Sequence, residues 1–238
     1  MRYRKLICDV IIVMIFSFIW LHMNRNILSR LDEMEILGLS ILNSSDAGYN
    51  NLISHGVMYS IFYLILLMVW LTQDNIQILV RKTRIQFILN QYKNVFWATF
   101  NFVAIFVGIL VLFNLIFEDI NLLRETNFAT GVVIYFFSLL LYYLLVGSIF
   151  ILLRLCFWSD IKAFVGTFAI QVVLLAVKRY LNVWIPASVT RVFDLLFENS
   201  LYAEEILINS VKIIILIVAL FAVTYTIFKE KDVLHEKI

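Results

Sequence analysis

The residues that could do chemistry are few and widely spaced. The only histidines are His22, His55 and His235, and none stands beside a second ligand at the spacing of zinc sites. Glu204 and Glu205 form an acidic pair, which we expect at the start of a helix, where negative charge suits the helix dipole. No nucleophile and base pair is visible. We therefore predict no catalytic residue and no metal site, and an enzyme is the least favoured class.

The chain also lacks the glycine-rich loop that binds nucleotide phosphates. None of its seven glycines is followed by lysine, so no G-x-x-x-x-G-K-[ST] sequence occurs. We expect no cofactor to be bound by this chain and no nucleic acid partner. Any use of ATP and Mg²⁺ would require a separate subunit that hydrolyses the nucleotide.

Composition sets the class of protein. The 238 residues are 63% hydrophobic and only 15% charged, with a mean hydropathy of +0.93, whereas soluble domains are about 45–50% apolar. Because a helix needs about 20 apolar residues to cross a bilayer, the sequence predicts an all-α, polytopic membrane protein that forms a single transmembrane domain over residues 1–238. The six predicted transmembrane helices cover residues 6–22, 54–72, 95–117, 130–153, 161–178 and 208–228. In the fifth, Lys162 and Lys178 must extend toward the membrane surfaces to reach full thickness.

Basic residues in short loops predict the orientation, since Lys and Arg accumulate on the cytoplasmic side. With both termini cytoplasmic, most of the 19 Lys and Arg residues lie inside. The predicted location is therefore a cell membrane, bacterial in type, crossed several times.

The charged segment 74–94 separates the second and third spans. Its apolar residues do not share one helical face, which indicates a break near Lys82 and Thr83. We predict a short helix along the membrane surface that ends in the basic RKTR cluster, then a second helix that leads into the third span. The cluster could dock a cytoplasmic partner, or it could simply anchor the loop at anionic membrane lipid.

Two further amphipathic segments, 27–42 and 187–199, are predicted on the outer side. In the second, the apolar residues lie opposite the charged residues at helical spacing. The apolar residues are Val192, Leu195 and Leu196, and the charged ones are Arg191, Asp194 and Glu198. Both segments are expected to lie at the outer membrane surface.

Polar residues inside the predicted spans form two weak stripes. They could line a path for an amphipathic substrate, or they could hold helices together by hydrogen bonds. Asn101 and Asn114 allow the same two interpretations. Asp9 lies one turn from Lys5, so an ion pair or hydration is expected there. The stripes comprise Tyr135, Ser138 and Tyr142 in the fourth span and Thr167 and Gln171 in the fifth.

Taken together, the six spans, the VRKTR run entering QFILNQYKN and the outer segment between the last two spans resemble the permease subunit of ABC transporters of the type-2 exporter class. The likeness is closest to the small permeases associated with bacteriocin or lantibiotic export. Members that export polysaccharide carry an amphipathic helix before the first span, whereas only MRYRK precedes it here, so a glycan substrate is less favoured.

The resemblance implies a coupling helix in the first cytoplasmic loop and a smaller second contact with an ABC-type ATPase. It also implies a second permease copy or a related permease as partner, and export of a peptide or amphipathic molecule. The alternative is a non-transporting immunity or sensor protein that binds a peptide or partner protein. The docking residues so implied are Ile76, Leu79, Val80, Arg81, Lys82 and Arg84 in the first contact, with Trp158, Ser159, Asp160 and Lys162 in the second.

Overall fold

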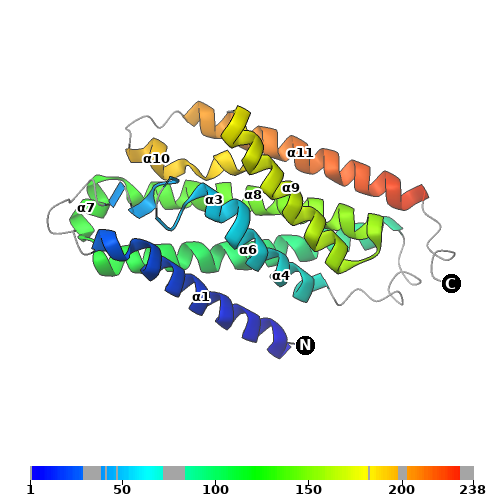
Figure 1. The fold of residues 1–238 in the computed structure, drawn as a ribbon, viewed down its shortest axis with the longest axis horizontal. Coiled ribbons are helices and arrows are strands. Elements are labelled where there is room, and N and C mark those ends of the chain that lie inside the picture. Colours follow the sequence, from blue (N-terminus) through cyan, green and yellow to red (C-terminus); the bar gives the residue numbers. More distant parts are fainter. Residues whose placement is uncertain are drawn as a thin grey trace.

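The computed structural model describes residues 2–28, 39–40, 42–46, 48–71, 84–181, 183–197 and 203–230. Within these ranges every regular element is helical, as the sequence predicts (Figure 1). Here η2 is a π-helical turn and η3 a 3-10 turn. The elements are α1 (Arg2–Leu28), α3 (Leu52–Ser54), η2 (His55–Tyr59), α4 (Ser60–Leu71), α6 (Arg84–Phe117), α7 (Ile120–Glu125), α8 (Phe128–Phe157), α9 (Asp160–Leu181), η3 (Pro186–Thr190), α10 (Val192–Phe197) and α11 (Ala203–Glu230).

Six of the described helices are long and apolar enough to cross a membrane, which confirms the predicted number. The stretches are Lys5–Arg25, Leu52–Leu71, Ile85–Phe117, Phe128–Phe157, Asp160–Leu181 and Glu204–Lys229. The second combines α3, η2 and α4 into one continuous helical run. The fifth has 22 residues and includes Lys162 and Lys178 near its two ends, so the extension of these lysines toward the membrane surfaces stays a prediction. Glu204 and Glu205 lie in the first turn of α11, as expected.

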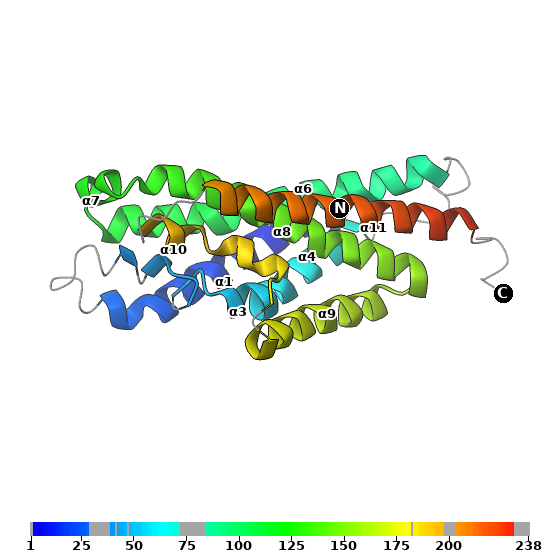
Figure 2. The same cartoon turned by 90° about the horizontal axis from the view of Figure 1, so that it is seen from above.

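Helix α8 is the centre of the bundle. It contacts α4, α6, α9 and α11, and more than half of its span is buried. Figure 2 shows α6 and α11 on one side of the bundle, with α1, α4 and α9 on the other. Close packing against α8 requires glycine at position 147, because a Cβ atom there would lie 2.5 Å from Val95 Cγ1 and 2.6 Å from Tyr63 Oη.

Helices α1 and α6 run in the same direction along one another. Toward the N-terminal end of α1, Asn101 Nδ2 donates to Asp9 Oδ1 at 2.8 Å. Further along both helices, Trp20 of α1 stacks on Phe113 of α6 at a ring distance of 4.6 Å. Asp9 thus pairs with an amide from α6, while the expected partner Lys5 places its Nζ 3.7 Å from the centre of the Trp70 ring. A cation over an indole face is a favourable alternative to an ion pair.

Two helices are longer than the membrane requires. At 1.5 Å per residue, the 34 residues of α6 and the 30 of α8 extend about 50 and 45 Å, compared with about 30 Å for a hydrocarbon core. At the end where α7 joins them, both pass beyond the end of α9 (Figure 1). That end of the bundle is completed by residues 42–51, η3 and α10.

The segment between α9 and α11 differs from the single amphipathic helix predicted over 187–199. It forms η3 and then α10, with residues 198 and 199 outside the described part. Pro186 starts η3, and Thr190 Oγ1 donates to Ala187 O at 2.9 Å, a local bond that competes with regular helix. Val192, Phe193 and neighbouring apolar residues of the segment are buried. The segment therefore packs into the bundle against α8.

Candidate functional site

The first predicted docking element falls mainly outside the described residues. So does most of the outer segment 27–42, of which residues 29–38 and 41 are not described. Arg84 is the first described residue of α6, so the predicted break near Lys82 and Thr83 lies outside the described residues. The docking residues outside the described part are Ile76, Leu79, Val80, Arg81 and Lys82.

The second docking element, Trp158 to Lys162, is the tight turn between α8 and α9. Trp158 takes a left-handed backbone conformation with φ of 50°, and its N–H donates to Arg154 O at 2.9 Å, which ends α8. Ser159 Oγ accepts the N–H of Lys162 at 3.4 Å, at the start of α9. The exposed side chain of Lys162 and the half-buried ones of Trp158, Ser159 and Asp160 thus sit together at one end of the bundle.

Arg154, which the sequence did not single out, connects this turn to two other helices. Its Nε donates to Asp160 Oδ1 at 2.6 Å, its Nη1 to Gln91 Oε1 at 3.2 Å, and its Nη2 to Leu71 O at 3.2 Å. Leu71 is the last described residue of α4. One guanidinium therefore joins α4, α6, α8 and the start of α9.

Aromatic rings pack the same end of the bundle. Phe87 of α6 stacks on Phe228 of α11 at a ring distance of 5.4 Å, and the Trp158 ring lies 6.5 Å from Phe228. One to two turns further from this end along α6 and α11, the rings of Tyr92 and Phe221 lie 5.1 Å apart. The start of α6 and the end of α11 are thereby held beside the α8–α9 turn.

The two polar stripes are buried and touch one another. Tyr142 Oη donates to Gln171 Oε1 at 3.0 Å, which joins α8 to α9. Ser138 and Thr167 are also buried. The Tyr142–Gln171 bond matches the interpretation in which polar residues hold helices together. These residues could line a substrate path only if α8 and α9 separated.

Tyr135, the remaining stripe residue, belongs to a hydrogen-bonded chain that the sequence did not reveal. Both nitrogens of the fully buried His55 meet tyrosine hydroxyls: Nδ1 lies 3.1 Å from Tyr143 Oη and Nε2 lies 2.8 Å from Tyr135 Oη. Tyr135 Oη donates to Asn50 Oδ1 at 3.0 Å, so it accepts from Nε2. The imidazole is then the neutral tautomer with its proton on Nε2, and its Nδ1 accepts a hydrogen bond from Tyr143 Oη.

The chain of bonds continues into the segment before the second span. Asn50 Nδ2 donates to Asn43 O at 3.2 Å, which fixes the orientation of the Asn50 amide. Asn43 Nδ2 in turn donates to Asn114 Oδ1 on α6 at 3.0 Å. Of the two asparagines in the third span, Asn114 thus ties α6 to residues 42–51, and Asn101 ties it to α1.

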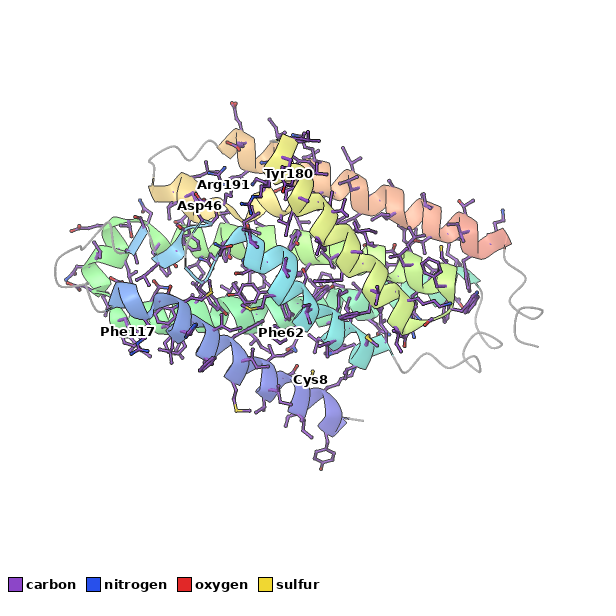
Figure 3. The ribbon with its side chains drawn as sticks, in the orientation of Figure 1. Cys8, Asp46, Phe62, Phe117, Tyr180 and Arg191 are labelled. Carbon is purple, nitrogen blue, oxygen red and sulfur yellow. The ribbon has the colours of Figure 1, made fainter. Side chains whose placement is uncertain are left out.

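A charged contact joins this segment to α10. Asp194 accepts hydrogen bonds from Ser45 N at 2.8 Å, from Ser45 Oγ, and from Arg191 Nε at 3.3 Å. Figure 3 shows Asp46 and Arg191 in the same region. We use the term outer latch, after the side on which the sequence predicts these residues, for Ser45, Asp194 and Arg191, which link the segment before the second span to α10.

Glu118 lies just beyond the end of α6. Its side chain is largely buried and its Oε1 has no hydrogen-bond partner. Burial disfavours the charged carboxylate and raises the pKa of Glu118 to about 7. Among the described residues, no group of three or more His, Cys, Asp and Glu side chains is placed to hold a metal ion.

Long apolar helices with apolar side chains exposed on their outer faces define a helical, polytopic membrane protein. Comparison with protein-family models, with curated proteins and with solved structures gives no match. A more specific function must therefore be argued from the residues of this chain.

Proposed function

We propose that this chain is the membrane-spanning permease subunit of an ATP-driven ABC exporter, which moves a peptide or amphipathic molecule out of the cell. It would act as a dimer with a second copy or a related permease, in a cell membrane with both termini cytoplasmic. The chain contributes no ATPase of its own. A separate ABC-type ATPase would bind ATP and Mg²⁺ and dock on the cytoplasmic ends of the helices.

The main support is that the described residues flanking the first docking element lie at the same end of the bundle as the second docking element. The first element, predicted within 74–84, is flanked by Leu71 of α4 and ends at Arg84 of α6, and the second is the turn from Trp158 to Lys162. Arg154 bonds both to Leu71 and to Asp160. A motor that bridges two such elements can alter the arrangement of helices around the membrane path.

The experiment is affinity purification of the full chain from membranes of its own host, with identification of any bound P-loop ATPase and measurement of ATP hydrolysis. Reversal of the basic cluster, Arg81→Glu with Lys82→Glu, should remove the ATPase while membrane insertion is retained. The matched control reverses Arg124 and Arg179, which are exposed elsewhere on the chain, and should leave the ATPase bound. Absence of an ATPase from the wild-type preparation would contradict the proposal.

A non-transporting immunity or sensor protein is the second candidate. It is favoured by the outer latch and by the Tyr142–Gln171 bond, because these close the outer end and use the polar residues that a path would need. Such a protein would bind an amphipathic peptide without ATP-dependent movement. Purified assemblies in proteoliposomes distinguish the two candidates, since only the exporter should hydrolyse ATP faster when peptide is added and transfer peptide across the bilayer.

A further inference from the structure

We infer that Arg154 is the positioning residue that transmits the movement of the ATPase from the two docking elements to the helix bundle. The inference rests on the proposed function and extends it to a single side chain. Arg154 lies on α8, the helix with the most neighbours, rather than in either docking element. It would therefore affect coupling without being part of the docking surface.

The geometry accounts for the choice of an arginine. Its three nitrogens reach a carboxylate on α9, an amide oxygen on α6 and a main-chain carbonyl at the end of α4. A planar guanidinium can hold three acceptors in fixed directions, whereas a lysine ammonium is a single flexible point charge. The position also favours a cation, because a helix C-terminus carries partial negative charge.

The burial of the contact makes it more than a surface ion pair. The side chain of Arg154 is 18% exposed and that of Asp160 is 32% exposed, and Gln91 is buried. Charge-assisted hydrogen bonds in such surroundings are shorter and stronger than neutral ones. The end of α4 and the start of α9 are therefore coupled, so that displacement of one pulls on the other.

The test separates binding of the ATPase from its coupling. The ATPase identified by copurification is reconstituted with the permease in proteoliposomes, and both its amount per permease and its permease-dependent stimulation are measured. Arg154→Gln should keep the bound amount within about twofold and reduce stimulation at least about tenfold, the factor that corresponds to the loss of one of its three charge-assisted hydrogen bonds. Arg124→Gln, an exposed arginine on α7, is the matched control and should preserve both quantities.

Arg154→Lys provides a readout that a merely structural role would not change. If only a positive charge were needed there, lysine would restore stimulation. We expect it to restore thermal stability but not stimulation, because one ammonium cannot hold all three acceptors. Full stimulation in Arg154→Lys or Arg154→Gln would overturn the inference, as would loss of ATPase binding in a folded Arg154→Gln protein.

A second variant keeps the inference falsifiable if Arg154→Gln fails to fold. Gln91→Met removes the acceptor on α6 with little change in side-chain volume, and it should lower stimulation while binding is unchanged. Stimulation at the wild-type level in this variant would then overturn the inference. If the wild-type chain binds no ATPase, the proposed function fails first, and this inference fails with it.

Discussion

Removal of one hydroxyl group tests whether the His55 chain of hydrogen bonds stabilises the fold. In Tyr135→Phe, His55 Nε2 loses its acceptor and Asn50 Oδ1 loses its donor, since the Tyr135 hydroxyl serves both. All three side chains are buried, so water cannot easily replace the bonds. The ring and its packing against Phe193 are retained in the phenylalanine variant.

The expected loss of stability follows from the two broken bonds. Hydrogen bonds between membrane helices contribute on average about 0.6 kcal/mol and at most about 1.7 kcal/mol, because unfolded helices in the membrane also find partners. Tyr135→Phe should therefore lower the free energy of unfolding by about 1–3 kcal/mol. The assay is unfolding of the purified protein by SDS in mixed micelles, followed by helix content and by tryptophan fluorescence.

The control is Tyr180→Phe, which removes the hydroxyl of an 82% exposed tyrosine and should change stability by less than about 0.5 kcal/mol. A double-mutant cycle of Tyr135→Phe with His55→Phe should show a coupling energy of about 0.5–2 kcal/mol, because the two groups share one bond. If Tyr135→Phe unfolds like Tyr180→Phe, the hydrogen-bonded chain does not contribute to stability and the reasoning is refuted.

Three other predictions concern single positions. Because the pKa of Glu118 is raised to about 7, the folded state binds more protons than the unfolded one between about pH 4.5 and 7. The free energy of unfolding should therefore fall as pH rises through that range. A Glu118→Gln variant measured at pH 5 and 8 should lose this dependence. Gly147→Ala should destabilise the folded protein by about 1–3 kcal/mol through overpacking, since the added Cβ would lie 2.5 Å from a side chain of α6. Gly108→Ala, with nothing within 4 Å of the added Cβ, should instead stabilise it by up to about 1 kcal/mol. Asp194→Ala removes the acceptor of both Ser45 donors and should speed amide hydrogen exchange in residues 43–51 about tenfold, measured by mass spectrometry; unchanged exchange would argue against the outer latch.

Composition and hydropathy were sufficient to predict the six long apolar helices. Uninterrupted apolar runs identify spans because the bilayer provides no water to satisfy an exposed backbone. The helical lead into the third span could also be predicted, and α6 is helical from its first described residue, Arg84. The polar stripes on α8 and α9 were visible as spacing, although nothing in the spacing indicated that Tyr142 and Gln171 would meet.

The residues that join helices could not be predicted in this way. Arg154 bonds to groups 83 and 63 positions away, and the apolar pattern of a helix does not specify which neighbour it faces. A main-chain acceptor such as Leu71 O leaves no trace in the sequence at all. His55 was the more accessible case, because a histidine inside an apolar run marks a place that needs polar partners.

The outer segment between α9 and α11 illustrates a different limit. Its alternation of apolar and charged residues predicted a surface helix, yet Val192 and Phe193 are buried and Asp194 bonds to Ser45. Amphipathic spacing predicts that one face is covered, but it does not distinguish lipid from protein as the covering. Here the apolar face packs on α8 beside Gly131, where a Cβ would meet Phe193 at 3.1 Å.

Helix α6 runs without interruption from Arg84 to Phe117 and contains no proline at which it could kink. One of its ends adjoins the segment that we propose as the motor's contact, and the other adjoins Glu118 and the bond between Asn114 and Asn43. A helix of this length that moves as a rigid body acts as a lever: a tilt of about 10° about one end moves the other by about 9 Å. The two faces of the membrane are thus connected mechanically by one helix, without a hinge between them.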